Sequence, residues 1–267
     1  MIPDTAVTRD TQFFSDHERP GERERLALFE QRYDSGTIRR LEAIGVAHGW
    51  SCLEVGAGGG SIARWLAERV GRTGHVVATD LDTRFFEDAA ASNFEAWRHD
   101  ITTDPLPTAA FDVVHVRWLL DLLPERERCI EKLIAALKPG GWLLDEEPDV
   151  FPLARVPPGP YRKLVEALIA VMRATGVDSQ WARTMPAVLA AAGLIDVQAE
   201  AEVDICRGGS ATAAGRRLSF AQLREHVLKA GLLTDTEFDQ GMADLTDASL
   251  WVMDVASVAA WGQKPTR

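Results

Sequence analysis

The stretch Leu53–Val70 reads LEVGAGGGSIARWLAERV, and it decides the fold expected for this chain. The apolar run Cys52–Val55 is typical of a buried strand and contains one carboxylate, Glu54. Four of the five residues at 56–60 are glycine, and apolar residues then recur at spacings of three and four, which predicts a helix from Ser61. Glycines let a ligand approach the backbone, and a helix start offers unpaired N–H groups with partial positive charge. We therefore expect a strand, a glycine turn and a helix that together bind a nucleotide-like ligand.

Composition and charge narrow the class of protein. The chain has 267 residues, 46% of them hydrophobic and 26% charged, which suits one large globular domain or a domain with a cap. A net charge of −11 and the lack of a basic stripe argue against a nucleic-acid partner. No apolar run is long enough to span a membrane, and residues 1–10 carry charges where a signal peptide needs an apolar region.

The three cysteines, Cys52, Cys129 and Cys206, are far apart and lack the spacing of metal ligands. We therefore expect free thiols in a reducing, cytoplasmic location. We also expect no metal site, although the acids that follow residue 145 leave a carboxylate site open.

Two further short segments also end in acids. His75–Asp80 and Phe94–Asp100 both read as short strands. Because the carboxyl ends of parallel strands meet at one edge of a sheet, Asp80 could accept hydrogen bonds from both hydroxyls of a ribose. This arrangement indicates an adenosine ligand without choosing among the enzyme classes that use one. A solvated turn aspartate is the alternative.

Four segments between Leu53 and Glu147, over a third of the chain, resemble the class I S-adenosylmethionine (SAM)-dependent methyltransferases of the type that modifies small molecules. The pattern E-x-G-x-G-x-G from Glu54 to Gly60 is similar to motif I, and FDVV from Phe111 is similar to motif IV. The resemblance implies an α/β fold with a Rossmann-like, seven-stranded, mostly parallel sheet. Helices would cover both faces, and the last strand would be antiparallel.

The resemblance also implies roles for individual residues. The acid of motif I would lie near the amino group of SAM, the glycines near its methionine part, and later acidic and apolar residues near its ribose and adenine. The strand over residues 111–118 would contact the methionine portion at its carboxyl end, with His115 packed inside. The expected cofactor-binding residues are Glu54, Gly56, Ala57, Gly58, Gly60, Asp80, Leu81, Asp100, Ile101 and Arg117.

Substrate residues are predicted from position and polarity. Glu147 lies at the end of the fifth strand and could orient or deprotonate a substrate, although the acids there could equally form a solvated turn. Tyr33, Trp118 and Trp181 are the predicted substrate contacts, and a packed aromatic side chain at a helix end is the alternative for Tyr33. Aromatic and apolar groups with few polar ones suit a small, partly hydrophobic metabolite, methylated on oxygen, nitrogen or carbon.

We expect residues 1–45 to form an N-terminal helical cap, with one helix ending at Tyr33 and a second beginning at Thr37 after Ser35. Residues 46–267 would be the SAM-binding domain, with helical insertions at about 151–192 and 211–246. We expect one helix over residues 178–194, a loop over 208–215 and the last strand over 251–262. The inserted helices could roof the substrate, or form core or the surface of a homodimer.

Two other functions remain open at this level. A protein of the same fold could bind SAM and catalyse a non-methylating reaction. A nicotinamide-dependent oxidoreductase could use a similar sheet, but Ser61 stands where its fingerprint requires glycine, and the pair Asp100–Ile101 also counts against it.

Overall fold

The computed structural model describes residues 19–88 and 92–266. They fall into two compact units. The sheet unit comprises Glu30–Glu147, Ala182–Glu200 and Val258–Arg267, and the helical unit comprises Met1–Phe29, Pro148–Trp181 and Ala201–Ser257. The charged segment 1–10, where we expect no signal peptide, lies outside the described residues.

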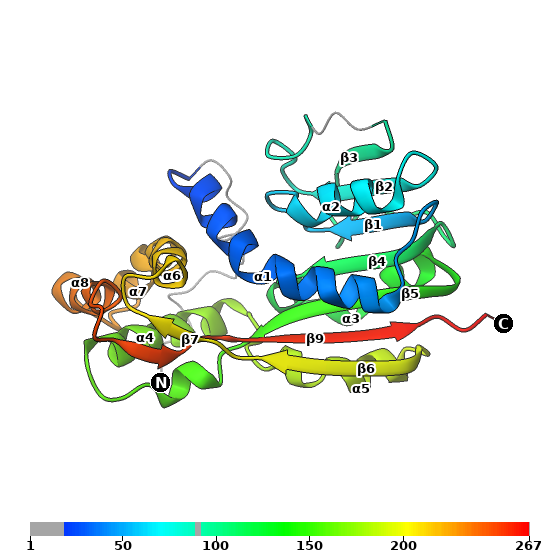
Figure 1. Ribbon diagram of the computed structural model, residues 1–267. Coiled ribbons are helices and arrows are strands. Elements are labelled where there is room, and N and C mark those ends of the chain that lie inside the picture. The colour runs from blue at the N-terminus through cyan, green and yellow to red at the C-terminus, as the bar shows by residue number, and fades with distance from the viewer. Residues whose placement is uncertain (1–18, 89–91, 267) are drawn as a thin grey trace. The chain divides into compact units, whose positions relative to one another are not determined.

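The sheet unit contains the predicted seven-stranded sheet, with helices around it (Figure 1). The strand order is β3-β2-β1-β4-β5-β9-β6. Strands β1 to β5 pair in parallel, and the last strand, β9, is antiparallel to the others, as expected. The strands are β1 (Ser51–Val55), β2 (His75–Asp80), β3 (Phe94–Arg98), β4 (Phe111–Arg117), β5 (Leu137–Asp149), β6 (Ile195–Glu202) and β9 (Ala256–Gln263).

Apolar side chains from the first helices and strands form the core of the sheet unit. Helix α2 (Ser61–Val70) follows the glycine turn and buries Ile62, Leu66 and Val70, the predicted face. These pack with Leu41 of α1 and with strand residues such as Val113. Helices α3 (Arg126–Ala136) and α5 (Met185–Ala191) belong to the same unit. The buried face of α2 therefore fixes the glycine turn against the sheet.

The strand register brings polar residues together at the carboxyl edge. Glu54 on β1 pairs with His115 on β4, and Arg117 on β4 pairs with Glu146 on β5. Because paired residues of neighbouring strands project to the same face, an acid and an imidazole meet inside the sheet. This register places the site described below.

Helix α1 (Glu22–Ile44) is continuous, so the predicted break at Ser35 is wrong. Serine and glycine are weak helix formers, but neither breaks a helix that is held by tertiary contacts. Thr37 and Arg40, just beyond the expected break, bond to groups of the sheet. The predicted cap of residues 1–45 and domain of residues 46–267 stay a prediction.

The helical unit contains α4 (Pro160–Thr175), α6 (Ala211–Gln222), α7 (Arg224–Lys229) and α8 (Asp235–Asp244), with a ribbon of β7 (Ile205–Arg207) and β8 (Trp251–Met253). The loop expected over 208–215 is wrong after Ser210, because that hydroxyl accepts from Ala213 N at 3.2 Å and caps α6. Alanines then favour the helix.

Two predicted elements are split in the structure. The last strand is divided into β8 and β9, and β8 pairs with β7 in a separate sheet. The helix expected over 178–194 is a short 3₁₀ turn, Trp181–Arg183, followed by α5. Pro186, near the start of α5, lacks an N–H and favours a new helix start there.

Among the helices of the described residues, none combines the length and apolarity needed to cross a bilayer.

Candidate active site

The glycine turn between β1 and α2 has the backbone geometry that its sequence predicts. Gly56, Gly58 and Gly60 have φ values of 71°, 55° and 78°, in the left-handed region that favours glycine. The N–H groups of Gly56 and Ala57 donate to Thr79 O at 2.8 and 2.9 Å, which ties the turn to β2. Helix α2 begins without a side-chain cap from its own N-cap residue, Gly60. The turn can therefore present backbone N–H groups to a ligand.

Asp80 lies at the tip of β2 beside this turn. Its Oδ2 accepts from Gly58 N at 2.9 Å, and its Oδ1 accepts from Asp82 N at 3.3 Å. Leu81 next to it is 40% exposed, unusual for a large apolar side chain in the sheet unit. A carboxylate and an exposed apolar side chain thus lie together at the strand end, where a ribose and an adenine were predicted.

Asp100 and Ile101 follow β3. One carboxylate oxygen of Asp100 accepts from Thr102 N at 2.8 Å and from Thr102 Oγ1 at 2.6 Å. Ile101 is buried, and its carbonyl accepts from Lys132 Nζ at 2.8 Å. These contacts stabilise a tight turn at the position expected to face the adenine, and the adenine contacts themselves stay predictions.

A buried histidine connects the acid of the glycine motif to β5. His115 Nδ1 lies 2.6 Å from Glu54 Oε2, and its Nε2 lies 3.0 Å from Glu146 Oε2. Burial opposes a charged imidazole, but the two carboxylates outweigh it and raise the pKa of His115 to about 9. His115 is therefore a packed histidine, as expected, and also a cation between two acids at neutral pH.

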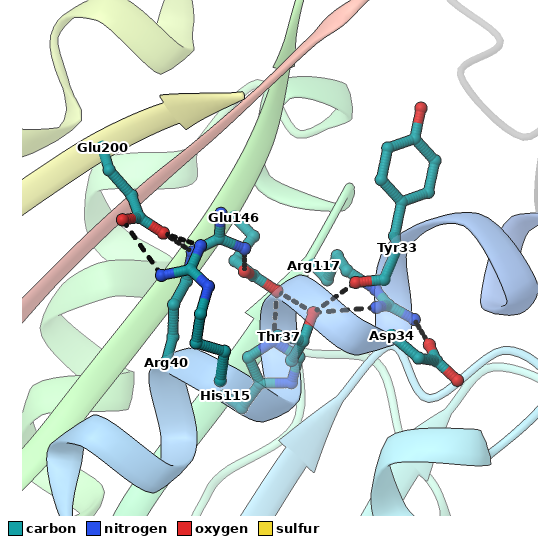
Figure 2. Close-up of polar contacts among 9 residues, drawn as sticks. Tyr33, Asp34, Thr37, Arg40, His115, Arg117, Glu146 and Glu200 are labelled. Atoms are coloured by element: carbon teal, nitrogen blue, oxygen red, sulfur yellow. Dashed lines mark hydrogen bonds and ion pairs between the residues drawn. The ribbon is translucent and has the colours of Figure 1, made fainter. Parts of the chain in front are cut away.

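Glu146 extends this network to α1 and β6. Its Oε2 accepts from Thr37 Oγ1 and its Oε1 pairs with Arg40 Nη1, both at 2.5 Å. Arg40 Nε also pairs with Glu200 Oε1 at 2.5 Å (Figure 2). Burial opposes ionisation of Glu146, yet His115 and the nearby arginines lower its pKa to about 2. The negative charges of Glu146 and Glu200 are therefore balanced by Arg40 and His115 inside the sheet unit.

Arg117, at the end of β4, contacts side chains of α1. Its Nη1 donates to Thr37 Oγ1 at 2.9 Å, and its Nη2 pairs with Asp34 Oδ1 at 2.9 Å (Figure 2). Arg117 thus fixes the helix that runs beside the strand ends. Its predicted contact with the methionine portion stays a prediction.

Two predicted substrate residues lie together. The rings of Tyr33 and Trp118 have centroids 4.9 Å apart, and the ring of Tyr33 points away from the polar network (Figure 2). Trp118 has a φ of 55°, a strained value for a bulky residue, which is seen most often at functional positions. Trp181, the third predicted contact, belongs to the helical unit and is buried there.

Glu147 is fully buried at the end of β5. Its Oε1 accepts from Leu119 N at 3.2 Å and from Leu120 N at 2.7 Å, at the start of the 3₁₀ turn Leu120–Leu122. Burial, together with the nearby Asp121 and Asp145, raises the pKa of Glu147 well above its usual value. Burial likewise raises the pKa of Asp145. A solvated turn, the alternative for these acids, is wrong for Asp145, Glu146 and Glu147 because all three are buried.

Among residues 19–88 and 92–266, no group of three or more His, Cys, Asp or Glu side chains has the arrangement of a metal site. The three cysteines are buried free thiols.

Comparison with known proteins identifies the segment that carries the glycine turn. A family model described as a methyltransferase domain matches residues 53–144, from β1 to β5. Residues 53–144 are a SAM-dependent methyltransferase domain. The cofactor of this domain is SAM, and the left-handed glycines, the start of α2 and the acids at the strand ends suit it. The match to a methyltransferase domain favours this class over a nicotinamide-dependent oxidoreductase.

The methyltransferase domain also has curated relatives. A ubiquinone/menaquinone biosynthesis C-methyltransferase UbiE from Stutzerimonas stutzeri (strain A1501) is 32% identical over 124 residues, which are 41% of this chain and 48% of the relative. The same enzyme from Pseudomonas putida (strain GB-1) is 31% identical over 124 residues with the same coverage. The chain spans about half the length of the curated relatives it matches.

Solved structures extend the likeness in fold to most of the chain. Phosphoethanolamine N-methyltransferase 2 of Haemonchus contortus has a TM-score of 0.62 at 15% identity, over 96% of this chain and 60% of that one. The [4+2]-cyclase SpnF has a TM-score of 0.51 at 20% identity, over 89% of this chain and 82% of that one. At these identities the likeness concerns the fold alone.

The sequence did not reveal the network of Thr37, Arg40, His115, Glu146 and Glu200. Its members are dispersed over the chain, and only the strand register and the position of α1 bring them together. The single available signal was the pair of acids Glu54 and Glu146 in strands that should otherwise be apolar.

Proposed function

We propose that this chain transfers a methyl group from SAM to a small, partly hydrophobic metabolite. The observation that carries the proposal is the left-handed glycine turn, bonded to Asp80, within a methyltransferase domain. The acceptor atom can be oxygen, nitrogen or carbon. The curated relatives, which match part of this chain, are C-methyltransferases by name, and this favours carbon as the acceptor atom.

The bound cofactor would supply an electrophilic methyl group on a sulfonium. The chain then has to hold the cofactor, place the nucleophile in line with the methyl group and exclude water. We assign the first task to the glycine turn, Asp80, Leu81 and the Asp100–Ile101 pair. Tyr33 and Trp118, whose rings lie together in the sheet unit, are the proposed aromatic contacts of the substrate. A cytoplasmic location and a homodimer remain further proposals.

The test is transfer of labelled methyl from SAM to a panel of phenols, amines and compounds with an activated carbon. Label in a product supports the proposal and identifies the acceptor atom. Conversion of a compound in the presence of SAM without label in the product would contradict it, and would favour a non-methylating enzyme. SpnF, a cyclase by name with this fold, makes that second function worth the control.

Replacing Gly58 with valine is expected to weaken binding of the product S-adenosylhomocysteine at least tenfold. A β-branched residue at a φ of 55° introduces roughly 1–3 kcal/mol of backbone strain. Relief of that strain would displace the N–H of residue 58, which donates a hydrogen bond to Asp80. Gly45→Val is the matched control, because Gly45 has a φ of 97° with open space around it. Calorimetry should show normal affinity in Gly45→Val. Normal affinity in folded Gly58→Val would refute the close approach of ligand and turn.

Replacing Glu147 with glutamine tests the proposed catalytic role of this residue. Glutamine resembles the protonated carboxyl that burial favours and can still accept from Leu119 and Leu120, so the fold should persist. If Glu147 orients or deprotonates the nucleophile, kcat should fall at least tenfold while cofactor affinity stays within twofold. Unchanged kcat would show that Glu147 takes no part in the reaction.

A further inference from the structure

Helix α1 brings an acid to the glycine turn that the family motifs do not include. A Cβ atom added to Gly59 would lie 2.2 Å from Glu30 Oε1, so this carboxylate lies directly against the turn. The backbone N–H of Ser61, the first residue of α2, hydrogen-bonds the same carboxylate. Glu30 therefore lies where the domain is expected to hold the methionine portion of SAM.

The carboxylate of Glu30 is only partly satisfied. Its Oε1 is buried, and no donor in the described part of the chain (19–88, 92–266) hydrogen-bonds it. A buried acceptor without a donor costs free energy, which a ligand N–H group would recover. Arg64, the nearby cation of α2, directs its Nη2 to Gly59 O at 2.6 Å. The orientation of Oε1 thus suits a donor supplied from outside the protein.

The negative charge of Glu54, the acid of the glycine motif, is already compensated by a neighbouring side chain. Glu54 Oε2 lies 2.6 Å from His115, which is charged at neutral pH between two carboxylates. An ammonium group at the turn would therefore meet a Glu54 whose charge is already compensated. Burial and the nearby Asp34 raise the pKa of Glu30, while Arg64, Ser61 N–H and Arg117 lower it, and an incoming cation would favour its ionised form.

We propose that Glu30 is a ligand for the α-ammonium group of the methionine portion of SAM. This inference rests on the SAM site at the glycine turn and adds to it a residue from α1. The contact would be a charge-assisted hydrogen bond from the ammonium to Oε1, with Ser61 N–H still bonded to the carboxylate. It would make cofactor binding depend on the position of α1, which the Thr37, Arg40 and Arg117 contacts fix.

The test compares three probes by calorimetry: S-adenosylhomocysteine, its analogue without the amino group and its analogue without the carboxylate. Glu30→Gln should weaken the first and third probes at least tenfold and the deaminated probe less than twofold. Comparing the probes on one protein sample cancels any partial loss of folded protein. Glu42→Gln, which removes an exposed charge from the same helix, should change none of the three affinities more than twofold.

Several outcomes would overturn the role of Glu30. Equal weakening of all three probes would mean that Glu30 only supports the turn. Unchanged binding of S-adenosylhomocysteine by Glu30→Gln would mean that Glu30 does not contribute to affinity, and tighter binding would mean that Glu30 obstructs the ligand. If the wild-type protein binds none of the probes, the SAM site itself is wrong. If it binds them and Glu30→Gln binds them equally well, only the role of Glu30 is wrong.

Discussion

Replacing His115 with asparagine is expected to destabilise the protein by about 3–5 kcal/mol, because it leaves Glu54 and Glu146 buried without the cation between them. Urea denaturation measures the change. His75→Asn is the matched control, since His75 on β2 also faces an acid, at 3.3 Å, but is 40% exposed. The control should change stability by less than about 1 kcal/mol. Equal effects of the two substitutions would contradict the account of the buried network.

The same substitution should change how stability depends on pH. The pKa of His115 rises from 6.5 to about 9 on folding, so its contribution is complete below pH 6.5 and is lost as pH rises through 9. Because the pKa values of Asp145 and Glu147 are also raised on folding, these acids likewise make the folded protein less stable as pH rises. This loss of stability should occur in His115→Asn as well. The difference between wild type and variant should therefore shrink between pH 6.5 and 9. Parallel curves would show that His115 is neutral in the folded protein.

Replacing Asp80 with alanine is expected to cost about 2–4 kcal/mol of cofactor affinity, through loss of charge-assisted hydrogen bonds to the ribose. The structure adds a second cause, because Asp80 Oδ2 also accepts from Gly58 N and so holds the glycine turn. Asp80→Asn keeps an acceptor for that N–H and removes the charge. Calorimetry with S-adenosylhomocysteine should therefore rank the proteins as wild type, then Asn, then Ala. Unchanged affinity in folded Asp80→Ala would refute the ribose assignment.

The sequence predicted the local parts of this fold because their signals are local. The apolar run before Gly56, the glycines and the periodic residues of α2 all act within about twenty residues, and they gave the correct strand, turn and helix. The break in α1 was wrong because Ser35 and Gly36 are weak helix formers whose effect is outweighed by contacts with distant residues.

The polar interior could not be predicted because it depends on register. A single acid in an apolar strand does not tell whether it faces a ligand, solvent or another strand. The pairing of Glu54 with His115, and of Arg117 with Glu146, decides this. Arg117 is an example, since its place at a strand end indicated a ligand contact, which stays a prediction, and the pairing of its guanidinium with Asp34 of α1 was not foreseen.

The most direct test of the central claim is a calorimetric titration of the wild-type protein with SAM, S-adenosylhomocysteine and NAD, repeated with Gly58→Val. The account predicts micromolar-scale binding of SAM and S-adenosylhomocysteine, no binding of NAD, and at least tenfold weaker binding of both adenosyl ligands in the folded variant. Binding of NAD without SAM, or full binding of SAM by Gly58→Val, would contradict the assignment of the glycine turn as the SAM site.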